Sequence, residues 1–210
     1  MTDNPSGEIQ LNLQIAPVSQ QSKAMHRAAF RAAIKTITSK YKYILSGDVS
    51  VDVEWSVHQQ ERYETDRAPD VDNILKPLID ALVGPDGLII DDNQIQHVAC
   101  RWIDAPITDE SVQIRLQHAS DDFLSKSGLY FGQLEGGLCV PLSQATPIEW
   151  QRKVLTHYEK CLATRNEAID SGMDYYTASA IMPIQRTFHR SRVGKFKIIP
   201  ANQILATTTP

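Results

Sequence analysis

The sequence of 210 residues has only three cysteines, Cys100, Cys139 and Cys161, and no CxxC pair. An odd number of widely separated thiols cannot close into a complete set of disulfides, which excludes a small disulfide-stabilised scaffold. Chains without a disulfide framework are typical of reducing compartments, so we expect a cytoplasmic protein.

Long apolar runs are also missing. No run approaches the roughly 20 residues that a membrane-spanning helix needs, and the first ten residues lack the basic and then apolar order of a signal peptide. We therefore expect no membrane contact. The apolar fraction of 42% and the charged fraction of 22% are instead typical of a globular chain that buries its own core.

Positive charge is in short supply, because the net charge is −4. This argues weakly against nucleic-acid binding, which depends on Lys and Arg to neutralise phosphate. The charge is unevenly distributed, since residues 186–197 carry five positive side chains and no acid. The acidic first part is compatible with carboxylates gathered around a divalent cation, whose charge inverts the local field.

Residues 8–118 predict a domain of the α+β class. Four segments alternate apolar and polar residues, the period of a half-buried strand: residues 9–15, 49–57, 98–102 and 111–117. Two segments repeat apolar residues at helical spacing: residues 23–37, through Met25, Ala28, Ala29, Ala32 and Ala33, and residues 71–82. The order β-α-β-α-β-β predicts a mixed sheet with both helices on one face, in which the last two strands form an antiparallel pair.

The remaining residues, 119–210, are expected to form a partly helical C-terminal extension. Residues 129–144 are rich in glycine and predict an irregular connection that can include one strand, whereas residues 147–171 have the apolar spacing of a helix. The role of this extension is open. It can add DNA contacts through its basic segment, offer a partner surface or alter the choice of substrate.

Polar residues interrupt two apolar segments near the middle of the chain. Four of them share one side of the helix predicted over residues 71–82: Asp72, Asn73, Lys76 and Asp80. Asp91 and Asp92 follow directly after a second apolar run. Carboxylates from two separated segments can therefore converge.

Convergent carboxylates are the oxygen ligands that Mg²⁺ prefers, and such a site suits phosphodiester hydrolysis with a nearby lysine to offset charge. Structural interpretations stand beside this one: Asp72 can cap a helix, Asp80 can form an ion pair with Lys76, and residues 91–93 can form a turn. A calcium-binding EF-hand is excluded, because Leu75 and Ala81 stand where that motif requires glycine and glutamate.

The stretch PDVDNILKPLIDAL, a short glycine turn and then apolar-DD-x-Q resemble the signature of RusA-like Holliday junction resolvases. The resemblance is specific over residues 67–100 and extends loosely over 8–118. It implies that the catalytic residues are Asp70, Asp72, Lys76 and Asp92. It further implies metal binding by the same three aspartates with Asp91 as a close neighbour, and DNA contacts from Arg67 and Asn73.

The resemblance implies a magnesium-dependent endonuclease that works as a homodimer on four-way DNA junctions in recombination and repair. Two alternatives remain open: a module that binds junctions or a protein without cutting, and a metal nuclease with another branched DNA or RNA substrate. The chain departs from the family pattern in its extension and in the loop before Asp70, where Arg62 and Arg67 are the only basic residues between 59 and 69.

Overall fold

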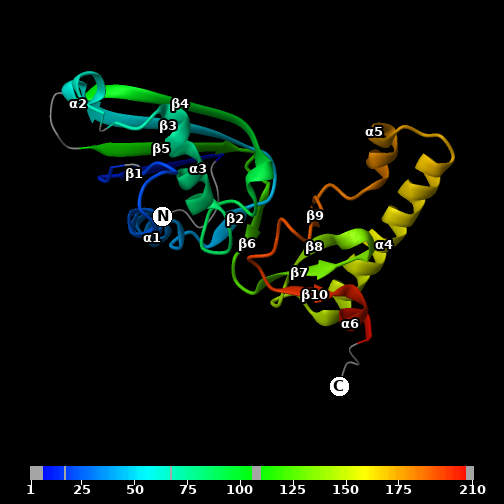
Figure 1. Cartoon of the computed structure of the whole chain (residues 1–210). Helices are drawn as coiled ribbons and strands as arrows, with labels where there is room; N and C mark the ends of the chain where they lie inside the picture. The colour runs from blue at the N-terminus through cyan, green and yellow to red at the C-terminus, as the bar shows by residue number, and fades with distance from the viewer. Residues whose placement is uncertain (1–6, 17, 67, 106–109, 207–210) are drawn as a thin grey trace. The chain divides into compact units, whose positions relative to one another are not determined.

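The computed structural model describes residues 7–16, 18–66, 68–105 and 110–206. The chain divides into two compact units, Met1–Leu124 and Ser125–Pro210. Helices and strands are mixed in both, which confirms the α+β class (Figure 1). The boundary falls six residues beyond the end expected for the first domain.

The first unit is built on a four-stranded sheet in the order β1-β5-β3-β4. The strands are β1 (Glu8–Leu13), β3 (Val49–His58), β4 (Ile95–Ala105) and β5 (Ser111–His118). β3 pairs with β4 in parallel, whereas β5 pairs antiparallel with both β1 and β3, so the sheet is mixed as predicted. Two short strands, β2 (Tyr43–Leu45) and β6 (Phe123–Ser125), form a second, two-stranded sheet.

The prediction that the last two strands form an antiparallel pair is wrong. β3 lies between β4 and β5, so the two strands run in opposite directions without touching as neighbours. Crossing one intervening strand requires about 10 Å, twice the spacing between neighbouring strands. The five residues between Ala105 and Ser111 are long enough for this, because an extended chain covers about 3.4 Å per residue. Loop length therefore did not distinguish a hairpin from a crossing.

Two helices, α1 (Ala24–Thr38) and α3 (Val71–Leu82), pack on one face of the sheet and share its core. Strand β3 turns every second side chain toward them, from Val49 to Val57. Helix α3 buries residues at helical spacing: Ile74, Pro77, Leu78, Ala81 and Leu82. A short helix, α2 (Gln59–Glu64), and a 3-10 turn, η1 (Asp92–Gln94), complete the unit.

Helix α1 forms as predicted but turns a different face to the core. It buries Phe30, Ile34 and Thr38, whereas Met25 is 70% exposed and the alanines at 28, 29 and 32 are exposed. Phe30 and Ile34 bury more apolar area than alanines do, and free energy scales with that area. The alanine-rich side of α1 is therefore left on the surface.

The second unit has a sheet of its own in the order β10-β7-β8-β9. Its elements are β7 (Leu129–Gln133), η2 (Glu135–Gly137), β8 (Leu138–Ser143), α4 (Ile148–Asp170), α5 (Tyr175–Ala178), η3 (Ser179–Ile181), β9 (Phe188–His189), β10 (Ile198–Pro200) and α6 (Ala201–Ala206). Apolar side chains of β7, β8, α4 and α6 form a core, which includes Val140, Leu155 and Ile204.

Helix α4 agrees with the one helix predicted for the extension, but the connection expected to be irregular, with one strand at most, forms the two strands β7 and β8. Tyr130, Phe131 and Gly132 are buried in succession, so β7 shows no alternation by which a half-buried strand is recognised. The turn between β7 and β8 uses Gly136 and Gly137 at φ 67° and 77°, a region that side chains rarely adopt. Glycine here marks a tight turn between strands.

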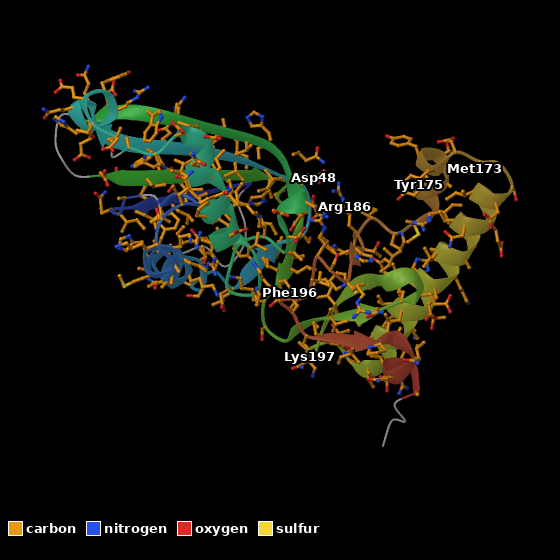
Figure 2. All side chains as sticks on the ribbon, viewed as in Figure 1. Asp48, Met173, Tyr175, Arg186, Phe196 and Lys197 are labelled. Atoms are coloured by element: carbon orange, nitrogen blue, oxygen red, sulfur yellow. The ribbon has the colours of Figure 1, made fainter. Side chains whose placement is uncertain are left out.

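On the second unit, two exposed side chains at the junction of α4 and α5 lie apart from Lys197 of the basic segment (Figure 2). Met173 and Tyr175, 43% and 67% exposed, lie where α4 leads into α5, and Lys197 lies far from them near β10 (Figure 2). Arg186 and Lys197 also lie at separate places, so the charge of the basic segment is spread over this unit (Figure 2).

The three cysteines are free thiols. Among the helices that the structure describes, none combines the length and apolar character needed to cross a membrane.

Candidate active site

Helix α3 presents its polar residues along the side that faces away from the core. Asp72 and Lys76 are exposed and Asp80 is half-buried, one helical turn after another. Asp70 occupies the N-cap position, but its side chain makes no capping hydrogen bond. Its carboxylate oxygens are therefore not used to cap the start of the helix.

A glycine turn carries the chain from the end of α3 to the second acidic segment. Gly84 has φ 110°, and a Cβ on Gly87 would lie 2.0 Å from the backbone oxygen of Leu82, so both positions require glycine. The following residues, Leu88 to Ile90, are fully buried. The chain then emerges at Asp91 and Asp92, as a sequence of apolar residues followed by carboxylates predicts.

Gln94 fixes this acidic segment from within the protein. It is 2% exposed, and its Oε1 accepts hydrogen bonds from the backbone N–H groups of Ile90 at 2.7 Å and Asp91 at 3.0 Å. Its Nε2 donates to the backbone oxygens of Leu45 at 3.0 Å and Gly47 at 2.8 Å. One buried amide thus joins the acidic loop to the start of the central strand.

The two neighbouring aspartates have different surroundings. The Asp91 Oδ1 accepts a hydrogen bond from the backbone N–H of Asn93 at 3.2 Å, which is the turn arrangement weighed from the sequence. The Asp92 Oδ2 instead lies 3.1 Å from the Lys76 Nζ. Asp91 shapes the loop, whereas Asp92 meets the polar side of α3.

Lys76 lies between two carboxylates, since its Nζ is also 2.7 Å from the Asp80 Oδ1. The pair with Asp80 agrees with the interpretation of that residue as an ion-pair partner. Hydrogen bonds to Asp80 and Asp92 raise the pKa of Lys76 above its ordinary value of 10.5. Lys76 is therefore an ammonium at neutral pH, able to offset negative charge but not to accept a proton.

The remaining predicted residues lie further along the helix. With a rise of about 1.5 Å per residue, Asp72 and Asp70 are displaced from Lys76 by about 6 and 9 Å along the axis. Within the described part of the chain, no three His, Cys, Asp or Glu side chains are grouped closely enough to hold a metal ion. A cation shared by Asp70, Asp72 and Asp92 stays a prediction.

Arg67 and Asn73 are the two residues predicted to contact DNA. Arg67 lies outside the described residues. Asn73 is half-buried in the first turn of α3, and its backbone oxygen accepts a hydrogen bond from the Gln20 N–H at 3.0 Å.

Gln94 is the main residue of the site to which the sequence assigned no role. Its place in the apolar-DD-x-Q pattern was visible, and so was its position next to the apolar residue Ile95. A polar amide beside apolar residues is often buried with its hydrogen bonds satisfied, but two of its four partners, Leu45 and Gly47, are distant in the sequence. Only the folded chain identifies them.

The first unit thus defines a class of protein: an α+β domain whose surface combines helix-borne and loop-borne carboxylates around a lysine. Residues 4–117, more than half of the chain, match the family model of endodeoxyribonuclease RusA, and the chain belongs to this family. The resemblance stated from the signature residues is thereby confirmed. No curated protein matches the chain.

Proposed function

We propose that this chain is a structure-selective endonuclease that hydrolyses phosphodiester bonds in four-way (Holliday) DNA junctions, in the cytoplasm, during recombination and repair. One observation carries the proposal: Lys76 is held between Asp80 and Asp92 in a domain of the endodeoxyribonuclease RusA family. A protonated lysine beside carboxylates suits a reaction in which a phosphate gains negative charge.

The donor chemistry of the site fits Mg²⁺, a hard ion that takes oxygen ligands. Asp70, Asp72 and Asp92 would hold the ion, with Asp91 as the close neighbour whose oxygen is bonded to the loop backbone. Asp70 and Asp72 are exposed, and the side chain of Asp70 forms no helix cap, so their oxygens are accessible. When bound, such an ion lowers the pKa of a water molecule and neutralises charge on the phosphate.

The protein's own residues have separable tasks in this proposal. Lys76 stays protonated and stabilises the charge that develops on the scissile phosphate. Asp80 and Asp92 hold its ammonium in place on the exposed side of α3. Asn73, in the first turn of the same helix, and Arg67 would contact the DNA beside the cut.

We also propose that the active unit is a homodimer. A four-way junction has approximate two-fold symmetry, and two cuts on opposite strands need two sites related by a matching axis. Strand β4 is an edge strand of eleven residues. It exposes Val98 at 42% and Ile103 at 39%. A long edge with exposed apolar residues is suited to pairing with the same edge of a second copy.

A cleavage assay with Mg²⁺ tests the function. Four-way, three-way, flap and linear duplex DNA are compared with the native protein and with Asp72→Asn, which removes a ligand oxygen at little cost in shape. Asp121→Asn, an exposed aspartate outside the site, is the matched control. We expect selective cutting of the four-way junction by the native protein and the control.

The same assay separates the alternatives. Asp72→Asn should bind the junction without cutting it, and turnover retained in this variant would remove the metal assignment. Equal cutting of all substrates would replace the junction by a broader class of DNA. Binding of junctions with no cutting by the native protein would leave a recognition module.

A further inference from the structure

A groove lies between the two helices that cover the sheet of the first unit. Its volume is about 460 Å³, and it is open to solvent. Residues of α1, of α3 and of the loop before α1 line it: Gln20, Ala24, Arg27, Ala28, Arg31, Lys76, Pro77 and Asp80. Lys76 and Asp80 also belong to the candidate active site, so the groove is continuous with that site.

The groove concentrates positive charge in an acidic unit. Residues 1–124 contain 19 Asp and Glu against 11 Lys and Arg, yet the groove is lined by Arg27, Arg31 and Lys76 with a single acid, Asp80. The Arg27 guanidinium donates a hydrogen bond to the backbone oxygen of Gln20. Across the described residues, no carboxylate forms an ion pair with Arg27 or Arg31. Their charges are therefore available to an anion from outside.

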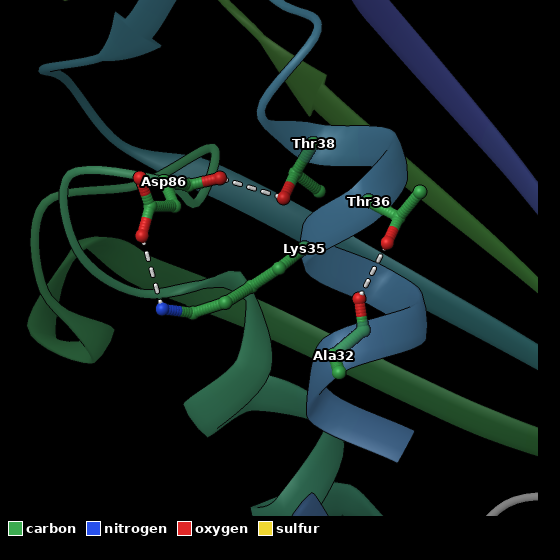
Figure 3. Close-up of polar contacts among 5 residues, drawn as sticks. All are labelled: Ala32, Lys35, Thr36, Thr38 and Asp86. Carbon is green, nitrogen blue, oxygen red and sulfur yellow. Dashed lines mark hydrogen bonds and ion pairs between the residues drawn. The ribbon is translucent and has the colours of Figure 1, made fainter. Parts of the chain in front are cut away.

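Both ends of the groove are fixed by hydrogen bonds between its walls. Pro77 lacks the N–H that would bond the oxygen of Asn73 within α3, and the Gln20 N–H bonds that oxygen instead at 3.0 Å. At the other end, Figure 3 shows Asp86, in the turn after α3, accepting from Lys35 Nζ at 3.1 Å and from Thr38 Oγ1 at 2.7 Å. The walls are thus held at a set separation.

The shape of the groove suits a chain of phosphates. Ala24 and Ala28 present small side chains, so a ligand can approach the helix closely. Arg27 and Arg31 are separated by about one helical turn, about 6 Å along the axis. Two guanidinium groups so spaced can each contact a different phosphate of one strand, and arginine binds phosphate oxygens with two parallel hydrogen bonds.

We infer that this groove binds the sugar–phosphate backbone of the DNA strand that continues beyond the scissile phosphate, with Arg27 and Arg31 contacting successive phosphates. The inference rests on the proposed function, because it takes DNA as the substrate held at Lys76. It assigns recognition of the strand to helix α1, outside the signature residues 67–100. It also gives a domain of negative net charge a local basic surface on which phosphate can bind.

Salt dependence of binding tests the inference. A fluorescently labelled four-way junction is titrated without Mg²⁺ at several salt concentrations, using the native chain, Arg31→Gln and the double variant Arg27→Gln with Arg31→Gln. Each lost phosphate contact should reduce the slope of log K against log salt by about one unit. Lys40→Gln is the matched control, because it removes an exposed charge beyond the end of α1 and outside the groove, and its slope should equal the native one.

A second pair of variants tests the groove by adding negative charge and leaves both arginines in place. Ala28→Glu introduces an acid into the groove, whereas Ala29→Glu introduces the same residue at an exposed position of the same helix outside it. Only Ala28→Glu should weaken junction binding, by tenfold or so if one repulsive contact costs about 1.4 kcal/mol. Thermal unfolding of each variant shows that the fold is retained.

The outcomes separate this inference from the proposed function. If the native chain cuts junctions while the double variant keeps the native salt slope, the groove is not the strand path and the endonuclease proposal stands. If the native chain binds with a slope that depends on both arginines but cuts nothing, the groove is supported and the endonuclease proposal falls. Equal loss of binding in Ala28→Glu and Ala29→Glu also overturns the inference.

Discussion

Replacing Gln94 by leucine should destabilise the first unit while keeping nearly the same side-chain volume. The substitution leaves four backbone groups without their partner: the N–H groups of Ile90 and Asp91 and the oxygens of Leu45 and Gly47. An unsatisfied buried group costs about 1–3 kcal/mol, and the four costs overlap because they share one site. We expect the free energy of unfolding to fall by about 3–5 kcal/mol.

Urea unfolding followed by tryptophan fluorescence measures this loss. Gln96→Leu is the control, since Gln96 is exposed two residues further along, and surface substitutions usually change stability by about 0.5 kcal/mol or less. If Gln94→Leu lowers stability no more than Gln96→Leu does, the buried amide does not hold the acidic loop and the reasoning is refuted.

The substitution Gln94→Glu tests the same buried hydrogen bonds through the pH dependence of stability. A carboxylate at this position would face the oxygens of Leu45 and Gly47 with nothing to donate, so the folded state should bind a proton that the unfolded state, with a pKa near 4.3, releases. A folded pKa raised above the unfolded value means that stability is lost as pH rises through that interval. Relative to the native protein, the variant should therefore be less stable at pH 8 than at pH 5.

Two further substitutions follow from the site and the sheet. Asp80→Asn weakens the contact that raises the pKa of Lys76 most, so this pKa, measured by NMR, should fall toward 10.5. Cleavage should slow about two- to fivefold, since a half-exposed ion pair contributes about 1 kcal/mol or less. Asp104→Asn, which breaks an ion pair with Arg62, is the control. Val98→Lys and Ile103→Lys place charge on the exposed edge of β4 and should yield monomers in sedimentation experiments without unfolding the chain. A native protein that is monomeric at every concentration would contradict the dimer.

The sequence predicted those elements whose burial follows a regular period. Every second residue of β3 is buried, and α3 buries residues three and four apart, so one face of each could be identified without coordinates. β7 is buried on consecutive residues, and α1 offers two apolar stripes, of which the bulkier one is in the core. Pattern alone does not settle such cases, because the outcome depends on which neighbour covers each face.

The site likewise has residues that sequence spacing places and contacts that only the folded chain reveals. Asp72, Lys76 and Asp80 share one side of a helix, which spacing alone establishes. The contact of Lys76 with Asp92 needs the path of the chain through the Gly84–Gly87 turn, and the role of Gln94 needs the position of residues 45–47. Long-range contacts of this kind are set by strand order, and the order β1-β5-β3-β4 was the part of the topology that the sequence predicted wrongly.

Strand direction explains why Asp92 meets the middle of α3 and not its start. β3 and β4 are parallel, so the chain must return along the sheet between them, and α3 is part of that return. The end of α3 therefore lies beside the beginning of β4, where Asp92 stands, and Asp92 contacts Lys76. One residue inserted between Lys76 and the turn would rotate Lys76 by about 100° about the helix axis relative to Asp92 and shift it by about 1.5 Å. The spacing between the two acidic segments is thus a geometric requirement of the site, which accounts for a signature that spans helix, glycine turn and acidic loop as one unit.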